Sequence, residues 1–252
     1  MHYENQKNIF LKLTPIVIVA FVICGCNNTS EKQNSKNSRL EINDITWGMT
    51  VEDTLDAFNA TRETASSFYE NSTGAVAQIE NGYEMFGEKT EQIILQFLDF
   101  KKGNGIKKLC QVDIVYPENA DMKSVLNKMK EAYGDTENKI TIYGMFQALS
   151  DEQLPQYDYQ ESDNLKLWGD SPIESIIPKE NFEEYEVLWE GFQPGLNKEK
   201  WPEFSKNARL VTAVYASGKN AYPSFKKNGV SFNAYNLLVL EEIKSQISKQ
   251  ED

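Results

Sequence analysis

Side chains suited to covalent or acid–base chemistry are few in this chain of 252 residues. It has three cysteines, Cys24, Cys26 and Cys110, and one histidine, His2. It lacks the sequence motifs of serine hydrolases, phosphate-binding loops, dinucleotide sites, zinc proteases and EF-hands. A partial S-x-x-K match in the segment 224–227 lacks the K-T-G motif that accompanies it in penicillin-recognising enzymes. We therefore predict no catalytic residue, no cofactor and no metal site.

The most specific signal lies in the first 26 residues. Lys7 and Lys12 precede an apolar run from Leu13 to Gly25, after which the chain becomes polar. This arrangement is typical of a secretory signal peptide. The run has 13 residues. A helix needs about 20 to span a bilayer, so a permanent transmembrane anchor is disfavoured.

The end of this run, Ile23-Cys24-Gly25-Cys26, resembles the lipobox of bacterial lipoproteins. In that pattern an aliphatic, a variable and a small residue precede the cysteine that is modified. The resemblance implies that Cys26 receives a diacylglyceryl group and becomes the N-terminus once residues 1–25 are removed. Two acyl chains anchor a protein stably, whereas one gives marginal binding. We therefore expect a chain anchored in the cell membrane through Cys26, on its extracytoplasmic face.

Removal of residues 1–25 would change the available chemistry. It leaves 24 basic and 37 acidic residues, a net charge of −13 and no histidine. Without imidazole, Ser-His-Asp catalysis, Cys-His catalysis and histidine zinc sites are excluded. The acidic balance disfavours nucleic acid as a partner, because Lys and Arg supply most of the affinity for phosphates. Cys110 would be the only free thiol, and its place in a predicted strand favours a core position over a reactive one.

Carboxylate pairs are a second group of candidates. Glu183 with Glu184, or Asp158, Glu161 and Asp163 in the segment 151–163, offer the ligands of a calcium site or the pair of a glycosidase. In so acidic a chain, neighbouring carboxylates are expected by number alone. A solvated acidic face is the favoured interpretation, and a carboxylate-based hydrolase ranks last among the functions we consider.

Aromatic residues concentrate in the second half of the chain. Four of them are the candidates for a ligand-binding surface: Trp168, Trp189, Trp201 and Tyr222. Exposed Trp and Tyr anchor protein interfaces and would also stack on a glycan. The alternative is that they complete a core of sheet and helices, because aromatics in strands are expected inside.

The elements that would position these residues follow from periodicity and turn signals. Residues 27–39 are polar and predict a flexible tether to a globular domain over 40–252, which divides into possible halves 40–134 and 135–252. Helices are predicted over about 50–58, 121–133 and 234–248, and strands over 93–100, 109–116, 140–146, 164–168, 173–177, 185–189 and 209–215, with a loop over 61–81. This order predicts an α+β fold with a mainly antiparallel sheet, packed helices and two loosely similar units that each begin with a helix.

A second resemblance lies at the start of the domain. The run Ile45-Thr46-Trp47-Gly48-Met49-Thr50, with Glu52 and Asp53 behind it, resembles the opening of many exported bacterial domains of unassigned function. It is also loosely similar to the start of small outer-membrane-assembly lipoproteins, which share a helix-then-sheet fold with the β-lactamase inhibitor protein. The resemblance implies a fold and no activity.

These expectations combine into one hypothesis and its rivals. The first is a non-enzymatic interaction module, tethered to the membrane through the lipid on Cys26, that binds a protein of the cell envelope. The alternative is a lipoprotein that binds a glycan, a cell-wall fragment or a small solute through the aromatic and acidic groups of the second half.

Overall fold

The computed structural model describes residues 40–42, 44–80, 82–101, 103, 105–136, 164–193, 195–218 and 228–249, and the backbone alone of 19–22, 139–144 and 157–160. The helices are α1 (Val51–Ala57), α2 (Met122–Tyr133), α3 (Phe182–Glu190), α4 (Trp201–Asn207) and α5 (Tyr235–Ser248), with short 3-10 helices η1 (Ile173–Ser175) and η2 (Lys179–Asn181). The strands are β1 (Val19–Val22), β2 (Ser67–Glu70), β3 (Gly74–Ile79), β4 (Glu84–Met85), β5 (Glu88–Lys89), β6 (Gln92–Leu98), β7 (Lys108–Tyr116), β8 (Lys139–Gly144), β9 (Tyr157–Gln160), β10 (Leu165–Gly169), β11 (Thr212–Ala216) and β12 (Asn228–Asn233).

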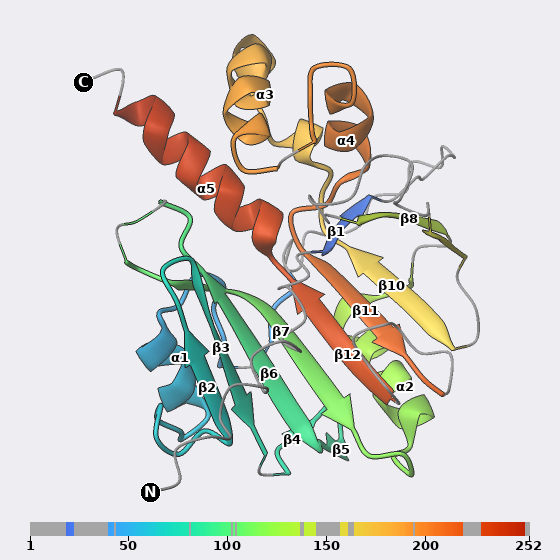
Figure 1. Cartoon of the computed structure of the whole chain (residues 1–252). Coiled ribbons are helices and arrows are strands. Elements are labelled where there is room, and N and C mark those ends of the chain that lie inside the picture. The colour runs from blue at the N-terminus through green and yellow to red at the C-terminus, as the bar shows by residue number, and fades with distance from the viewer. Residues whose placement is uncertain are drawn as a thin grey trace, which may run out of the picture.

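Seven strands form the central sheet, in the order β10-β11-β12-β7-β6-β3-β2 (Figure 1). Every pair in it is antiparallel. The smaller sheets are β1-β8-β9 and β4-β5, also antiparallel. The predicted α+β class with a mainly antiparallel sheet is therefore confirmed.

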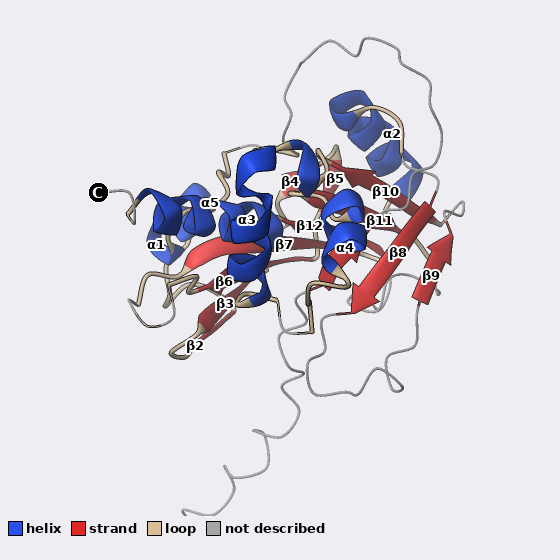
Figure 2. Ribbon diagram, turned by 90° about the horizontal axis from the view of Figure 1, so that it is seen from above, coloured by secondary structure: helices blue, strands red, loops and turns tan. Residues whose placement is uncertain are grey.

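The two faces of the central sheet differ in chemistry. On one face, Phe232 of β12 packs against the rings of Phe86 and Tyr133, with centroids 6.0 and 5.8 Å apart. Successive side chains of a strand point to opposite faces, so its neighbours Ser231 and Asn233 lie on the other face. Viewed from above, α1 and α2 lie on the first side of the sheet, and β8 and β9 on the second (Figure 2).

The helix α2 shows how local sequence sets an element. The Asp121 side chain accepts a hydrogen bond from the backbone N–H of Ser124 and caps the first turn. Met122, Val125 and Met129 form its buried stripe, and Gly134, with φ of 84°, ends it. The predicted helix over 121–133 is confirmed. The Tyr133 hydroxyl donates to the carbonyl of Glu41 at 2.6 Å and ties the first residues of the domain to this helix.

The Trp-Gly-Met-Thr run has a physical explanation. The Trp47 indole donates to the carbonyl of Leu40 at 2.9 Å. Gly48 has φ of 88°, and a Cβ there would lie 3.2 Å from Cδ2 of Leu238. The Gly48 N–H donates to the carbonyl of Leu109 and the Leu109 N–H to that of Met49, so the run lies against the start of β7. Thr50 then caps α1 by accepting from the N–H of Asp53 at 3.2 Å.

Other predicted elements are also found. The hairpin predicted over 93–100 and 109–116 is β6 and β7, and the final helix is α5. The strands predicted over 140–146, 164–168 and 209–215 correspond to β8, β10 and β11. The halves 40–134 and 135–252 supply separate sets of strands, but β7 and β12 pair directly and unite them in one sheet. The similarity of the halves stays a prediction.

Three local predictions are wrong. The segment 61–81 contains β2 and β3, because Ala75, Ala77 and Ile79 alternate inward despite the polar composition around them. The segment 185–189 is helical, since Tyr185 and Trp189 are four residues apart and face the core together in α3. The segment 173–177 begins with η1 and is not a strand, and α4 and β12 were not predicted at all.

Candidate functional site

The three candidate tryptophans lie in the interior. The exposed fraction is 2% for Trp168 and 0% for both Trp189 and Trp201. The Trp168 indole donates to the carbonyl of Gly134 at 3.0 Å, and the Trp189 and Trp201 rings pack with their centroids 5.9 Å apart. Rings without exposed faces cannot stack on a ligand, so these three side chains do not form the expected surface platform and serve the core instead. Tyr222 lies outside the described residues.

The cysteines separate into two cases. Cys26, with its expected lipid, and Cys24 lie outside the described residues. Cys110 is buried, with 3% exposed, and its Sγ lies 3.4 Å from the carbonyl oxygen of Gln96. Burial and then the nearby Asp113 carboxylate raise the pKa of this thiol. Because the thiolate is the reactive form, the environment of Cys110 disfavours nucleophilic chemistry.

A buried carboxylate lies at the centre of the sheet. Asp113 of β7 accepts four hydrogen bonds: from Ser231 at 2.5 Å, from the Gln111 amide to both oxygens at 3.0 Å, and from Gln96 at 3.1 Å. Asn233 extends this network by donating to Gln111 at 3.0 Å. Burial raises the pKa of Asp113, while the hydrogen bonds oppose that rise. A carboxylate has about four acceptor positions. The group is therefore saturated, and its role is to join β6, β7 and β12.

The other carboxylates give no convergent set in the described residues. Glu183 is exposed and Glu184 half-exposed in the first turn of α3. The side chains of Asp158, Glu161 and Asp163 lie outside the described residues. In the described part of the chain, no three Cys, Asp or Glu side chains are grouped as a metal ion would require.

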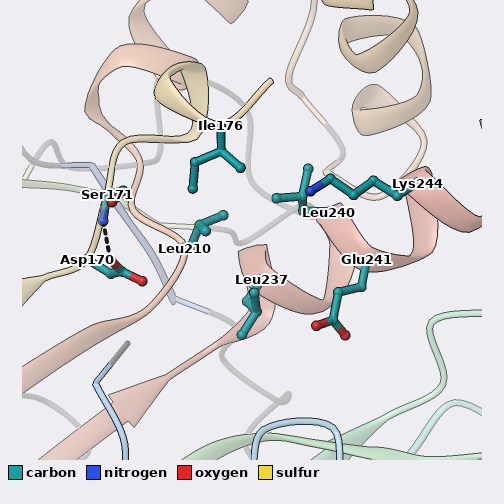
Figure 3. Close-up of a pocket in the computed structure, with 8 residues that line it drawn as sticks. All are labelled: Asp170, Ser171, Ile176, Leu210, Leu237, Leu240, Glu241 and Lys244. Carbon is teal, nitrogen blue, oxygen red and sulfur yellow. Dashed lines mark hydrogen bonds between the residues drawn. The ribbon is translucent and has the colours of Figure 1, made fainter. Parts of the chain in front are cut away.

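A small pocket lies beside α5, where three parts of the second half meet (Figure 3). Its volume is about 140 Å³. Four aliphatic side chains and four polar residues line it: Ile176, Leu210, Leu237 and Leu240, with Asp170, Ser171, Glu241 and Lys244. The three leucines are almost fully buried. The pocket therefore combines an apolar interior with a charged rim.

Backbone hydrogen bonds fix the walls of the pocket. The N–H of Leu237 donates to the carbonyl of Leu210 at 3.1 Å, which joins the first turn of α5 to the segment between α4 and β11. The N–H of Asp170 donates to the carbonyl of Val211 at 2.9 Å. The Asn236 amide donates to the carbonyl of Arg209 at 2.9 Å. Two main-chain bonds and the Asn236 side chain thus fix the positions of the segments that form the walls.

The polar and charged residues of the rim lie on two sides of the pocket, with Asp170 and Ser171 on one side and Glu241 and Lys244 on the other. The Asp170 carboxylate accepts from the N–H of Ser171 at 2.6 Å. Glu241 and Lys244 are exposed and lie one helical turn apart on α5. The sequence predicts the helix that carries Leu237 and Leu240 but not this site, because the walls come from three segments, 170–176, 210 and 237–244, which lie 34 and 27 residues apart in the chain. The one available signal was the pair of charges that follows these leucines on the same helical face.

The fold and site together define an α+β domain with a broad antiparallel sheet and a small, charge-rimmed apolar pocket. Comparisons with protein-family models, with curated proteins and with solved structures found no match. None of the helices in the described part of the chain has the length and apolar character needed to cross a bilayer.

Proposed function

We propose that the chain is a membrane-tethered, extracytoplasmic lipoprotein whose globular domain is a non-enzymatic interaction module at the cell envelope. The observation that carries this proposal is the lipobox-like run Ile23-Cys24-Gly25-Cys26 at the end of an apolar leader. The globular domain begins with buried side chains, Leu40 and Ile42. This start fits a domain that is preceded by an anchor and a polar tether.

The chemistry of the described side chains supports binding over catalysis. Asp113 is buried and its oxygens already accept four hydrogen bonds, so it has no free acceptor position for a substrate. Cys110 is buried as a thiol of raised pKa. Both groups contribute to the interior of the domain, and the charged residues of the pocket lie at its rim.

The dimensions of the pocket favour a protein partner over a glycan or a cell-wall fragment. Sites for small molecules usually enclose about 300–1,000 Å³, whereas this pocket encloses about 140 Å³. That volume suits one side chain, and a single buried anchor is typical of the energetic centre of a protein interface. The burial of Trp168, Trp189 and Trp201 removes three of the four side chains that were candidates for a glycan-binding surface.

Lipid attachment is tested in the precursor. The full-length chain, the Cys26→Ala variant and the Cys24→Ala variant are expressed in a bacterial host that is fed an alkyne fatty acid. We expect the label on the unmodified chain and on Cys24→Ala, with membrane association, and its loss from Cys26→Ala. Label that persists in Cys26→Ala would contradict anchoring through Cys26. Crosslinking in intact cells then tests for a partner, and a chain that crosslinks to no envelope protein would contradict the interaction module.

A further inference from the structure

We infer that the pocket beside α5 binds the C-terminal residue of a partner polypeptide. Its aliphatic side chain, of about leucine size, fills the cavity, and its terminal carboxylate pairs with the ammonium group of Lys244. This inference rests on the proposed function of the domain as an interaction module, and it names the chemistry of the partner at this site.

The volume and lining of the cavity define the side chain. An engineered cavity of about 150 Å³ lined by Leu, Ile and Phe holds one benzene molecule. At about 140 Å³, the pocket suits one branched aliphatic group. Ile176, Leu210, Leu237 and Leu240 surround it with carbon atoms. A polar side chain would lose its hydration there without regaining hydrogen bonds, so an apolar one is selected.

The charges on α5 indicate which group of the ligand lies beside its aliphatic side chain. Lys128 and Glu131, three residues apart on α2, form an ion pair with 2.9 Å between nitrogen and oxygen. Glu241 and Lys244 have the same separation on α5, yet the described residues give them no ion pair with each other. Figure 3 shows their charged ends directed apart, with the Lys244 side chain extended along the helix toward Leu240. Lys244 is therefore available to an incoming anion.

The opposite wall orients that anion. Asp170 and Ser171 form the rim across from α5, and neither brings a cationic group there. Among the eight lining residues Lys244 is the one basic side chain, so a ligand carboxylate is favoured beside it. Glu241 lies one helical turn before Lys244, and its carboxylate would accept a hydrogen bond from the backbone N–H of the same terminal residue. A terminal carboxylate, an adjacent N–H and one aliphatic side chain occur together at the end of a polypeptide.

A free aliphatic amino acid carries the same carboxylate and side chain, so the experiment separates the two sources. Fluorescent pentapeptides of the form Gly-Ser-Gly-Ser-Leu, with a free C-terminal carboxylate or a C-terminal amide, are titrated with the full-length protein in detergent. We expect the free acid to bind and the amide to bind about tenfold more weakly or worse, since charge-assisted bonds are the stronger ones. Unlabelled free leucine is added as a competitor; because it lacks the residues that precede the terminal one, we expect it to displace the labelled peptide less effectively than unlabelled peptide does.

Two exposed lysines, Lys244 in α5 and Lys249 at its C-cap, give a matched pair of variants. Lys244→Ala should weaken binding of the free-acid peptide about tenfold and abolish its preference over the amide. Lys249→Ala, at the C-terminal end of the same helix and outside the pocket lining, should leave both affinities unchanged. Circular dichroism confirms that both variants are folded.

Three results of the titrations would overturn the inference even if the peptide binds. These are equal affinity for acid and amide, an unchanged affinity in Lys244→Ala, and displacement by free leucine as effective as displacement by peptide. Absence of any peptide binding would also overturn it. The titration is repeated on the Cys26→Ala chain, so a failure of this site remains distinct from a failure of lipid anchoring.

Discussion

The hydroxyl oxygen of Ser231 lies 2.5 Å from Oδ1 of Asp113, although 118 residues separate the two in sequence. This bond joins the neighbouring central strands β12 and β7, in which the two residues face each other directly. Because a register shift of one residue would send these side chains to opposite faces, the bond favours a single pairing of the two halves of the sheet.

The first prediction concerns that bond. Ser231→Ala removes a donor to a buried carboxylate, and we expect the free energy of unfolding to fall by about 1–3 kcal/mol. Urea denaturation measures it. Ser248→Ala is the control, because that hydroxyl is exposed and bonds only the carbonyl of Lys244 in its own helix. The control should change stability by less than about 0.5 kcal/mol. Equal losses in the two variants would contradict the assigned role.

The second prediction concerns pH. Burial raises the pKa of Asp113 in the folded state. Above the ordinary pKa, the folded state then holds more protons at this site than the unfolded state does. Its contribution to the free energy of unfolding therefore falls as pH rises toward the raised pKa. Asp113→Asn lacks this titration. We expect the stability of Asp113→Asn relative to the unmodified chain to increase as pH rises above about 4, the ordinary pKa of this carboxyl group, toward the raised pKa of the folded state, measured by urea denaturation. A difference that is independent of pH would contradict the raised pKa.

The third prediction concerns Gly48. A Cβ at this position would combine a positive φ with a 3.2 Å approach to Leu238 of α5. Gly82 also has a positive φ, of 61°, but no atom lies within 4 Å of such a Cβ. Gly82→Ala should therefore lower the free energy of unfolding through backbone strain alone, by about 1 kcal/mol. Gly48→Ala should lower it by about 2–3 kcal/mol. Thermal and urea unfolding compare the two. A loss in Gly48→Ala no greater than that in Gly82→Ala would show that contact with Leu238 is unimportant.

The fourth prediction concerns Cys110. Since its thiol is buried and its pKa is raised, the folded protein should alkylate at Cys110 far more slowly with iodoacetamide at mildly alkaline pH than the unfolded protein does. Mass spectrometry of the peptide that contains Cys110 measures the labelled fraction, which avoids interference from Cys24 and Cys26. Rapid labelling in the absence of denaturant would mean that the thiol is reached from solvent.

Much of the fold could be predicted where periodicity and turn chemistry agree. Asp121 and Gly134 bound α2 as their capping preferences predict. The prediction failed where composition and spacing disagree. Tyr185 and Trp189 are residue types frequent in strands, yet their spacing of four suits one face of a helix. The strand β12 was missed because it contains Asn, Gly and Ser, and its Ser231 and Asn233 belong to a polar network that only the folded sheet assembles.

The candidate site was less predictable than the fold. Aromatic residues were expected to mark a binding surface, but Trp189 and Trp201 fill the interior. The pocket instead uses Leu210 and Leu240, which are ordinary core residues in sequence. Cavities arise from the distances between elements, and a single sequence holds no signal for those distances.

The hydrogen bond between Tyr133 and Glu41 has a consequence for a lipid-anchored chain. It fixes the point at which the domain begins, so the proposed tether would comprise the 13 residues 27–39. Fully extended, such a segment reaches about 45 Å. The domain would search a thin layer above the bilayer, within which the tether sets a high effective concentration for neighbours on the same membrane. Partners farther from the membrane than the tether allows would not be contacted. The distance of a partner from the membrane would therefore contribute to the choice of partner.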